Sequence, residues 1–308
     1  MEGRGDGPLP LPPGGGILVI DKPRGPSSHQ VTAWAGEILG QKVGHAGTLD
    51  PGVSGVLVVM VGKAVGLAPV LLAHDKEYVA VVRVHANVEE TDLRRVCSEF
   101  CGRIYQRPPR RSAVSRSLRI RTVQALDLLE YAGRVAVLRI TCDAGTYIRS
   151  LCHHMGLALG CGAHMQELRR TRSGPYREDC AHTLFELRDA ADAFREGDEE
   201  HLRRLILRPE TAVACLPPVV IRDSAVDALC HGAALAGVGI TSRGSFGRGD
   251  LVAVFTGRGE LVCIGEALVP SAGVIPGKPG LVVAPRRVFL ARGTYPPGWK
   301  KGKEGKGA

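Results

Sequence analysis

The sequence predicts an α+β fold, with a large mixed or antiparallel sheet flanked by helices and a small β-barrel after it. In the first two thirds of the chain, short apolar strand patterns alternate with helical patterns. Pro209, Pro217 and Pro218 then mark a boundary, and beyond it glycine-rich sequence with short apolar runs is typical of a small barrel. We therefore expect a flexible N-terminal extension (1–16), a first domain (17–209), a barrel (210–295) and a disordered basic tail (296–308).

The elements of the first domain can be assigned in chain order. Ile17–Ile20 reads as a strand, and a helix follows because Val31, Ile38 and Leu39 recur at helical spacing. Ser27 or Ser28 would cap this helix and Gly40 would end it. We expect further strands at 53–61, 76–84, 123–130 and 135–142, and helices at 64–72, 89–100, 146–159 and within the acidic segment 181–207.

Composition limits the class of protein. A formal net charge of +9 and a pI of about 9.2 favour a polyanionic partner, nucleic acid before membrane. No run approaches the ~20 apolar residues of a membrane span, and the Gly/Pro-rich start with its acids does not resemble a signal peptide, so we expect a cytoplasmic protein. The nine cysteines lack the spacing of a disulfide framework or a zinc site, so no metal is predicted.

The most informative segment is Gly44-His45-Ala46-Gly47-Thr48-Leu49-Asp50-Pro51. It places the carboxylate of Asp50 in a glycine-rich turn directly before the buried strand pattern 53–61. A loop held by a core strand is where catalytic groups are commonly found. Taken alone, however, an Asp in a Gly/Pro turn is more often a turn former that accepts hydrogen bonds from nearby amides.

The motif G-H-x-G-T-L-D-P followed by x-V-x-G-V-L resembles the catalytic motif of the TruB-type pseudouridine synthases. The resemblance is stronger to the archaeal and eukaryotic branch, the dyskerin-like catalytic subunit of H/ACA guide-RNA particles. D-K-P-x-G-x-x-S-x-x-V near the N-terminus and G-A-H-M-x-E-L-R-R (Gly162–Arg170) are similar to further family motifs. The resemblance implies a pseudouridine synthase fold in which Asp50 is the catalytic nucleophile and no cofactor is required.

Four further site residues are implied by the resemblance. Arg149, in G-T-Y-I-R, would pair with Asp50 through two parallel bonds and keep a buried carboxyl ionised. Tyr78, in K-x-Y, would stack on the flipped uracil. Leu168 would line the uracil pocket, and His45 would lie beside the flipped base. Without the family, these four would read as a surface arginine, a core tyrosine, an ordinary core leucine and a turn histidine.

Two regions add an RNA-binding signal. The ordered motifs between Val219 and Leu261, such as His231-Gly232-Ala233 and Gly249-Asp250, resemble a PUA domain. Residues 103–121 hold seven arginines and no acid, and could neutralise RNA phosphates. A solvated basic face is the alternative for this segment.

The resemblance also bears on how the RNA is found. Bacterial stand-alone enzymes of the family carry a longer, threonine-rich insertion after the K-x-Y strand, whereas only residues 85–91 separate strand and helix here. This favours the guide-dependent branch acting on rRNA. The implied partners are an H/ACA guide RNA, a small zinc-ribbon protein, a small β-barrel protein and a kink-turn-binding protein, with one copy of this chain per particle. The lack of a long lysine-rich tail favours an archaeal origin.

Two alternatives stay open at this point. The chain could be a guide-independent tRNA pseudouridine-55 synthase acting on the TΨC loop. It could also be a non-catalytic RNA-binding scaffold, in which case Asp50 would be dispensable.

Overall fold

The computed structural model describes residues 9–107 and 117–296. The chain divides into two compact units. The first comprises Leu18–Val59 and Ala68–Leu205, together with Leu9, and the second comprises Pro10–Ile17, Met60–Leu67 and the chain from Ile206 onward. The predicted domain limits stay predictions. The basic tail and the middle of the arginine-rich segment lie outside the described residues.

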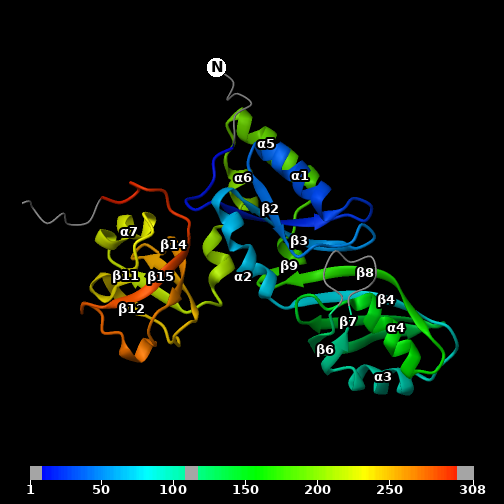
Figure 1. Cartoon of the computed structure of the whole chain (residues 1–308). Helices are drawn as coiled ribbons and strands as arrows, with labels where there is room; N and C mark the ends of the chain where they lie inside the picture. The colour runs from blue at the N-terminus through cyan, green and yellow to red at the C-terminus, as the bar shows by residue number, and fades with distance from the viewer. Residues whose placement is uncertain (1–8, 108–116, 297–308) are drawn as a thin grey trace, which may run out of the picture. The chain divides into compact units, whose positions relative to one another are not determined.

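Within the described residues, nine strands form one mixed sheet in the first part of the chain (Figure 1). Their order is β1-β3-β8-β4-β7-β6-β5, with β2 paired to β3 and β9 to β8. The β3–β8 pair is parallel, whereas β4 pairs antiparallel with both β7 and β8. The strands are β1 (Gly16–Lys22), β2 (Val43–Ala46), β3 (Ser54–Val61), β4 (Lys76–Val84), β5 (Gly102–Gln106), β6 (Arg119–Ala132), β7 (Val135–Cys142), β8 (Ala163–Ser173) and β9 (Tyr176–Arg177). The α+β prediction is confirmed.

Helices flank this sheet. One buried cluster joins β4, β6 and β7 to α3 and α4, including the predicted stripe Ile148, Leu151, Cys152 and Met155 of α4. In Figure 1, α1 and α5 lie side by side, and the Arg195 side chain of α5 donates to the Ile38 carbonyl of α1. The helices are α1 (Ser28–Leu39), α2 (Ala68–Ala73), α3 (Glu90–Glu99), α4 (Ile148–Ala158), α5 (Leu184–Glu196) and α6 (Glu200–Leu205), with 3-10 turns η1 (Gly62–Leu67) and η2 (Glu178–Cys180).

The first helix follows its sequence signals closely. Ser27 caps α1 in a capping box with Gln30, and Gly40 ends it in the left-handed conformation with φ 61°. The helix expected at 64–72 is instead a 3-10 turn followed by the short α2. Glycines at 62 and 66 weaken a helix there, and Pro69 has no amide to donate, so an α-helix begins only at Ala68.

Strand β8 was not predicted, although it lies between β3 and β4 in the sheet. Its sequence AHMQELRRTRS has no apolar alternation. The reason is that its charged side chains are paired inside the fold: Arg169 binds Asp21 through two hydrogen bonds of 2.9 and 3.1 Å, and Arg172 binds Asp75 through two of 3.1 and 2.8 Å. Strand prediction relies on apolar residues at every second position, so it does not detect a strand whose arginines have buried or half-buried partners.

The second unit is built on a six-stranded sheet in the order β11-β15-β14-β13-β10-β12. Alternating apolar residues of these strands and helix α7 form one core, to which Tyr295 also belongs. The Tyr295 hydroxyl donates to Glu260 at the end of the β13–β14 hairpin. The elements are η3 (Pro209–Val213), β10 (Pro218–Ile221), α7 (Asp223–Cys230), β11 (Leu235–Ala236), η4 (Gly237–Gly239), β12 (Ile240–Arg243), β13 (Leu251–Thr256), β14 (Leu261–Ala267), η5 (Ser271–Gly273) and β15 (Leu281–Val288).

The end of the predicted N-terminal extension packs against the fold. Leu9 is buried, and its N–H donates to the Leu39 carbonyl at 3.0 Å. Gly15 approaches the backbone so closely that an added Cβ would lie 2.3 Å from the Val61 carbonyl oxygen. The expectation of a flexible chain up to residue 16 is therefore wrong for residues 9–16.

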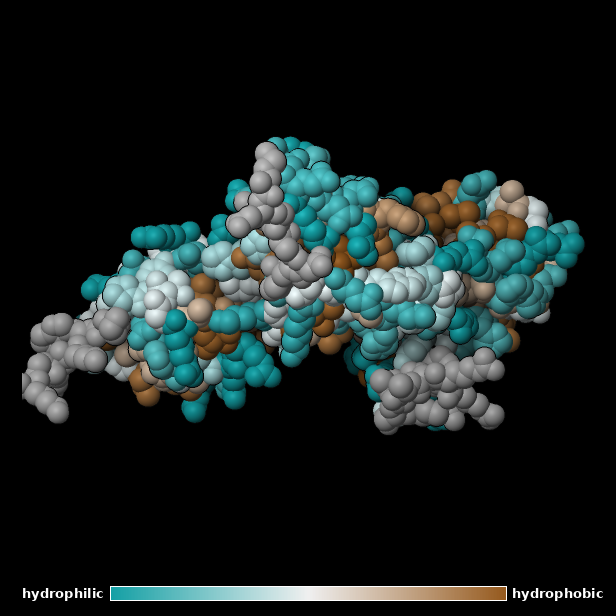
Figure 2. All heavy atoms as spheres, turned by 90° about the horizontal axis from the view of Figure 1, so that it is seen from above, coloured by the Kyte–Doolittle hydropathy of each residue, from teal (hydrophilic) through white to brown (hydrophobic). Residues whose placement is uncertain are grey.

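Hydrophilic residues cover most of the face shown in Figure 2, with apolar patches between them. The largest exposed fraction among the large apolar side chains described belongs to Phe185 of α5, at 82%. None of the described helices combines the length and apolar character needed to span a bilayer.

Candidate active site

The Asp50 loop joins β2 to β3, and its backbone is held by a glycine turn and by hydrogen bonds to Ser28. Gly47 has φ 82°, a left-handed conformation that favours glycine. The hydroxyl of Ser28, at the start of α1, accepts from the Leu49 N–H at 2.8 Å and donates to the Leu49 carbonyl at 2.9 Å. The residue before Asp50 is thereby held on both of its backbone polar groups.

Lys22 lies beneath this loop and is fully buried. Its ammonium group donates to the carbonyls of Pro23 and Val53, each at 2.8 Å, and to that of Pro51 at 3.4 Å. Burial lowers the pKa of Lys22, while the nearby Asp50 carboxylate opposes that shift. The buried ammonium group of Lys22 thus links the chain after β1 to the segment directly after Asp50.

The predicted partner of Asp50 is in place. Arg149 Nη2 donates to Asp50 Oδ2 at 3.0 Å. Two details of the prediction are wrong: there is one hydrogen bond in place of two, and the carboxyl is not buried, since the side chains are 63% and 64% exposed. An ion pair this exposed contributes only ~0–1 kcal/mol to stability. Its effect here is to orient an accessible carboxylate.

Gln106 binds the start of the helix that carries Arg149. The N-cap residue before helix α4 is Tyr147, whose side chain makes no cap hydrogen bond. The buried Gln106 amide instead donates to the Tyr147 carbonyl at 3.1 Å and accepts from the Tyr147 N–H at 2.9 Å. The end of β5 is thereby joined to the first turn of the helix that carries Arg149.

Tyr78 and Leu168 lie on the same face of the sheet. On the β4–β8 pair, Tyr78 is opposite Arg170 and Ala80 is opposite Leu168, so the two site residues are diagonal neighbours. Both are half-buried and pack on the cluster that includes α4. Burial raises the pKa of the Tyr78 phenol, and the Arg170 charge partly opposes this, so the phenol keeps its proton at neutral pH. Tyr78 and Leu168 together form a largely apolar patch, which we call the ledge.

Arg170 connects this ledge with the Asp50 loop. Arg170 is 1% exposed, and its guanidinium donates to the carbonyl of Val56 at 2.7 Å and to that of Gly47 at 2.8 Å. The backbone of Arg170 is also in contact with β3, where Gly55 is its partner in the parallel ladder. One side chain therefore fixes β8, β3 and the catalytic loop to one another.

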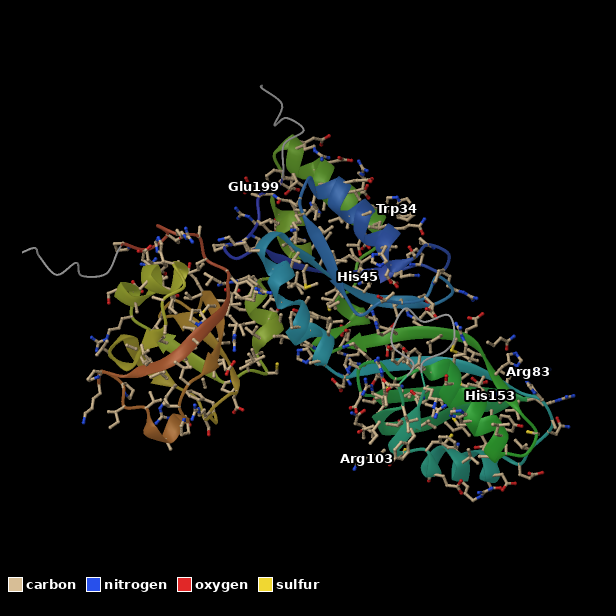
Figure 3. All side chains as sticks on the ribbon, viewed as in Figure 1. Trp34, His45, Arg83, Arg103, His153 and Glu199 are labelled. Carbon is tan, nitrogen blue, oxygen red and sulfur yellow. The ribbon has the colours of Figure 1, made fainter. Side chains whose placement is uncertain are left out.

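His45 lies in β2, directly before the Asp50 loop. Its ring is half-buried and meets the His29 ring edge to face, with 4.9 Å between centroids. Burial lowers the pKa of His45, and the neighbouring His29 and Arg170 lower it further, so the imidazole is neutral at pH 7. Figure 3 shows His45 near the α1 helix, which carries Trp34.

The structure thus brings together Asp50 and Arg149 directly, and Tyr78, Leu168 and His45 around Arg170. Sequence reasoning missed Lys22, Ser28, Gln106 and Arg170 as positioning residues. Lys22 and Ser28 were present in the quoted D-K-P-x-G-x-x-S motif, and Arg170 in L-R-R, so motif membership was the available signal. Of the arginine-rich segment, Arg103 and Arg107 are exposed, and residues 108–116 lie outside the described residues, so phosphate binding there stays a prediction.

Family comparisons agree with this site. The family model described as TruB family pseudouridylate synthase (N terminal domain) matches residues 37–148, and that for the tRNA pseudouridylate synthase B C-terminal domain matches 149–214. A PUA domain model matches residues 217–289. The "Probable tRNA pseudouridine synthase B" of Methanosarcina barkeri is 49% identical over 94% of this chain and 87% of its own length. That of Pyrobaculum calidifontis is 51% identical over 93% and 87%.

Two solved structures are similar over most of the chain. A Cbf5-Nop10-Gar1 complex matches with a TM-score of 0.85 and 49% identity, covering 90% of this chain and 85% of the other. An H/ACA RNP bound to a substrate RNA containing 2'-deoxyuridine matches with a TM-score of 0.87 and 44% identity, covering 97% and 95%. Fold and site define an RNA-modifying isomerase with a C-terminal PUA domain. The chain belongs to the TruB family of pseudouridine synthases.

The contact between β3 and β8 yields a first prediction. Gly55 has φ 101°, and an added Cβ would lie 2.2 Å from the Arg170 carbonyl oxygen. Gly55→Ala should therefore lower the free energy of unfolding by about 2 kcal/mol or more and lower the thermal midpoint. Gly52→Ala is the matched control, because nothing lies within 4 Å of its added Cβ. Equal thermal midpoints for the two variants would contradict the proposed close contact.

The Gln106 bridge yields a second prediction. Gln106→Leu leaves both backbone polar groups of Tyr147 without this partner and should reduce kcat about 10-fold through misplacement of Arg149. In an Arg149→Ala background the same change should reduce kcat much less, because the two residues act as a unit. Turnover of the single and double variants tests this. Additive losses in kcat would show that Gln106 acts independently of Arg149.

Proposed function

We propose that this chain converts uridine to pseudouridine in RNA as the catalytic subunit of an H/ACA guide-RNA particle. The observation that carries the enzyme assignment is the accessible Asp50 carboxylate, which is bound by Arg149 at 3.0 Å. A nucleotide everted from RNA can reach such a carboxylate, whereas a buried acid would be closed to it.

The reaction breaks the C1′–N1 bond of uridine and forms a C1′–C5 bond. C5 loses a proton and N1 gains one, so the product is an isomer and no redox cofactor or group donor is consumed. Asp50 would act on the sugar–base junction as the base detaches, rotates and rejoins. Arg149 would orient the carboxylate, Tyr78 and Leu168 would contact the uracil, and His45 would lie beside it.

Two observations support guide dependence. Of the similar solved structures, which are 44–49% identical, one holds Nop10 and Gar1, another holds Nop10, and a third holds a substrate RNA. In addition, β4 ends at Val84 and α3 begins at Glu90, so only five residues connect them. This connection leaves no room for a long tRNA-holding insertion. We therefore propose that guide RNA pairing and small protein partners supply the choice of uridine.

Substitution of Asp50 tests the enzyme assignment in the particle reconstituted with guide RNA and the small partner proteins. Asp50→Ala should reduce pseudouridine formation by about 10³-fold or more, because the reacting carboxylate is lost. RNA affinity should stay within about two-fold, since the ion pair with Arg149 contributes little to stability. Asp189→Ala, which removes an exposed acid on α5, is the control. Full modification by Asp50→Ala would contradict catalysis by Asp50 and favour the alternative of an RNA-binding scaffold.

A second candidate is guide-independent modification of tRNA at position 55. It is favoured by the names of the curated relatives, which are called probable tRNA pseudouridine synthase B. Purified full-length protein should modify a bare tRNA transcript much more slowly than the guided particle modifies its target. Rapid turnover on bare tRNA would overturn strict guide dependence and leave the isomerase assignment intact.

A further inference from the structure

The His164 side chain belongs to the G-A-H-M-x-E-L-R-R motif, but the candidate active site does not use it. His164 lies in β8, and His85 directly follows β4. The Nε2 atom of His85 and the Nδ1 atom of His164 form a hydrogen bond of 2.8 Å, with 5.1 Å between the ring centroids. The two residues are 79 positions apart in the chain, so the spacing of residues along the sequence could not pair them.

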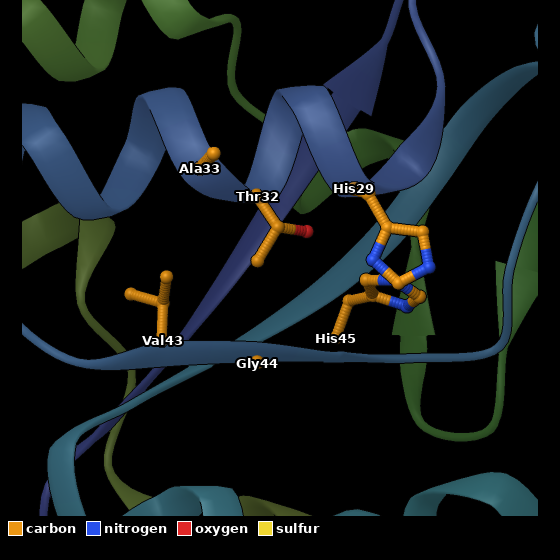
Figure 4. A pocket seen from close by; sticks show the side chains of 6 residues that line it. All are labelled: His29, Thr32, Ala33, Val43, Gly44 and His45. Carbon is orange, nitrogen blue, oxygen red and sulfur yellow. The ribbon is translucent and has the colours of Figure 1, made fainter.

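Three pairs of histidine rings are in contact within the described part of the chain, and only this pair is joined through ring nitrogens. His29 and His45 meet edge to face at the hollow between α1 and β2 (Figure 4), and His45 Nδ1 has no hydrogen-bond partner among the described residues. His153 and His154 are neighbours on α4, with 5.9 Å between their centroids. The pair at the ends of β4 and β8 therefore differs in directing two ring nitrogens at one point.

The backbone on both strands holds this pair in place. The His85 N–H donates to the Gly162 carbonyl at 3.0 Å, and Ala163 lies opposite Val84 in the β4–β8 ladder. Gly162 has φ 82°, and an added Cβ would lie only 2.7 Å from His85 Nδ1. The glycine thus leaves the space in which the His85 ring lies. Two side chains on a rigid pair of strands lose little freedom when they bind a common ligand.

Two imidazole nitrogens at this separation suit a divalent transition-metal ion. With metal–nitrogen bonds of about 2.0–2.1 Å, two ligands of a tetrahedral ion lie about 3.4 Å apart, so the two nitrogens need to separate by only about half an ångström. Both side chains are exposed, which allows this adjustment and leaves the other coordination positions open to water. The ring that now donates the shared hydrogen would carry it on its other nitrogen, so that both facing nitrogens bind the metal.

The surroundings limit the strength of such a site. Among residues 9–107 and 117–296, no group of three or more His, Cys, Asp and Glu side chains is placed to hold a metal, so the pair supplies two ligands. Arg134 donates to the His85 carbonyl at 3.4 Å, and Arg83 lies opposite His164 in the ladder, so two positive charges are close by. We therefore expect weaker binding than at a four-ligand structural site.

The pair lies away from the candidate active site. Strand β4 carries Tyr78 near one end, and His85 follows the other end, about 20 Å along the strand at ~3.3 Å per residue. Figure 3 shows Arg83, at this end of β4, well apart from His45. A metal ion bound here would not touch the reacting groups.

We infer that His85 and His164 together bind one divalent transition-metal ion of the class of Zn²⁺ or Ni²⁺, through His85 Nε2 and His164 Nδ1. The ion would join the end of β4 to the start of β8. The inference does not depend on the proposed function, because neither ligand lies at Asp50. It goes beyond the sequence analysis, in which the spacing of the cysteines predicted no metal.

Titration of the full-length protein with Ni²⁺ tests the inference. Ni²⁺ is the probe because imidazole suits it, whereas Zn²⁺ is also bound by thiolates and the chain has nine free cysteines. His85→Ala and His164→Ala should each weaken the binding of one Ni²⁺ ion at least about 10-fold. The double variant should lose no more than either single variant, because chelation needs both rings. Mg²⁺ should not compete, since it prefers oxygen ligands.

The matched control is the double variant His153→Ala/His154→Ala, which removes two exposed imidazoles that no mutual hydrogen bond joins among the described side chains. It should bind Ni²⁺ as the wild type does. Unchanged Ni²⁺ affinity in either single variant would overturn the inference. Additive losses in the double variant would show two independent imidazoles in place of one site, and an equal loss in the control would show binding to exposed histidines in general.

Discussion

The burial of the Arg170 guanidinium is the interaction on which the rest of the site depends. A charge with 1% exposure is tolerated only where its donors are satisfied, and here two of them bind the carbonyls of Val56 and Gly47. Arg170 also lies opposite Tyr78 in the sheet, so the register of β4 and β8 places Tyr78 beside the residue that binds Gly47 of the Asp50 loop. Arg170 is more than 100 residues away in the chain from Val56 and Gly47, and its side chain joins β8 to both of them.

The Asp50–Arg149 pair is weak by comparison, and the surrounding backbone contacts explain why it can still be well placed. Lys22 binds the Val53 carbonyl after the turn, and Ser28 binds the backbone of Leu49. Gln106 binds the backbone of Tyr147 at the start of α4. Each of these side chains is buried and binds main-chain groups. The exposed carboxylate therefore remains open to a large substrate, and the precision required for catalysis comes from residues that need not touch it.

Sequence patterns predicted the fold where local rules dominate. Helix α1 carries its own start and stop in Ser27 and Gly40, and strand β4 alternates as expected, so both were located correctly. Strand β8 was missed because its arginines obtain partners only in the folded sheet. The same reason hid Arg170 and Gln106 as positioning residues, since a buried polar side chain is recognised by what it binds. Asp50 and Arg149 were identified through family motifs, whereas the exposure of their pair could be learned only from the structure.

Strand β3 has a practical consequence for work on separate pieces of this protein. Its first part belongs to the unit that holds the active site, whereas Met60 and Val61 belong to the unit formed by the C-terminal third, as do Pro10–Ile17. A cut near residue 205 would leave the C-terminal fragment without two N-terminal segments of its own compact unit. The barrel alone would keep its core cluster, which lies within residues 219–295, and would lose the packing of those two segments.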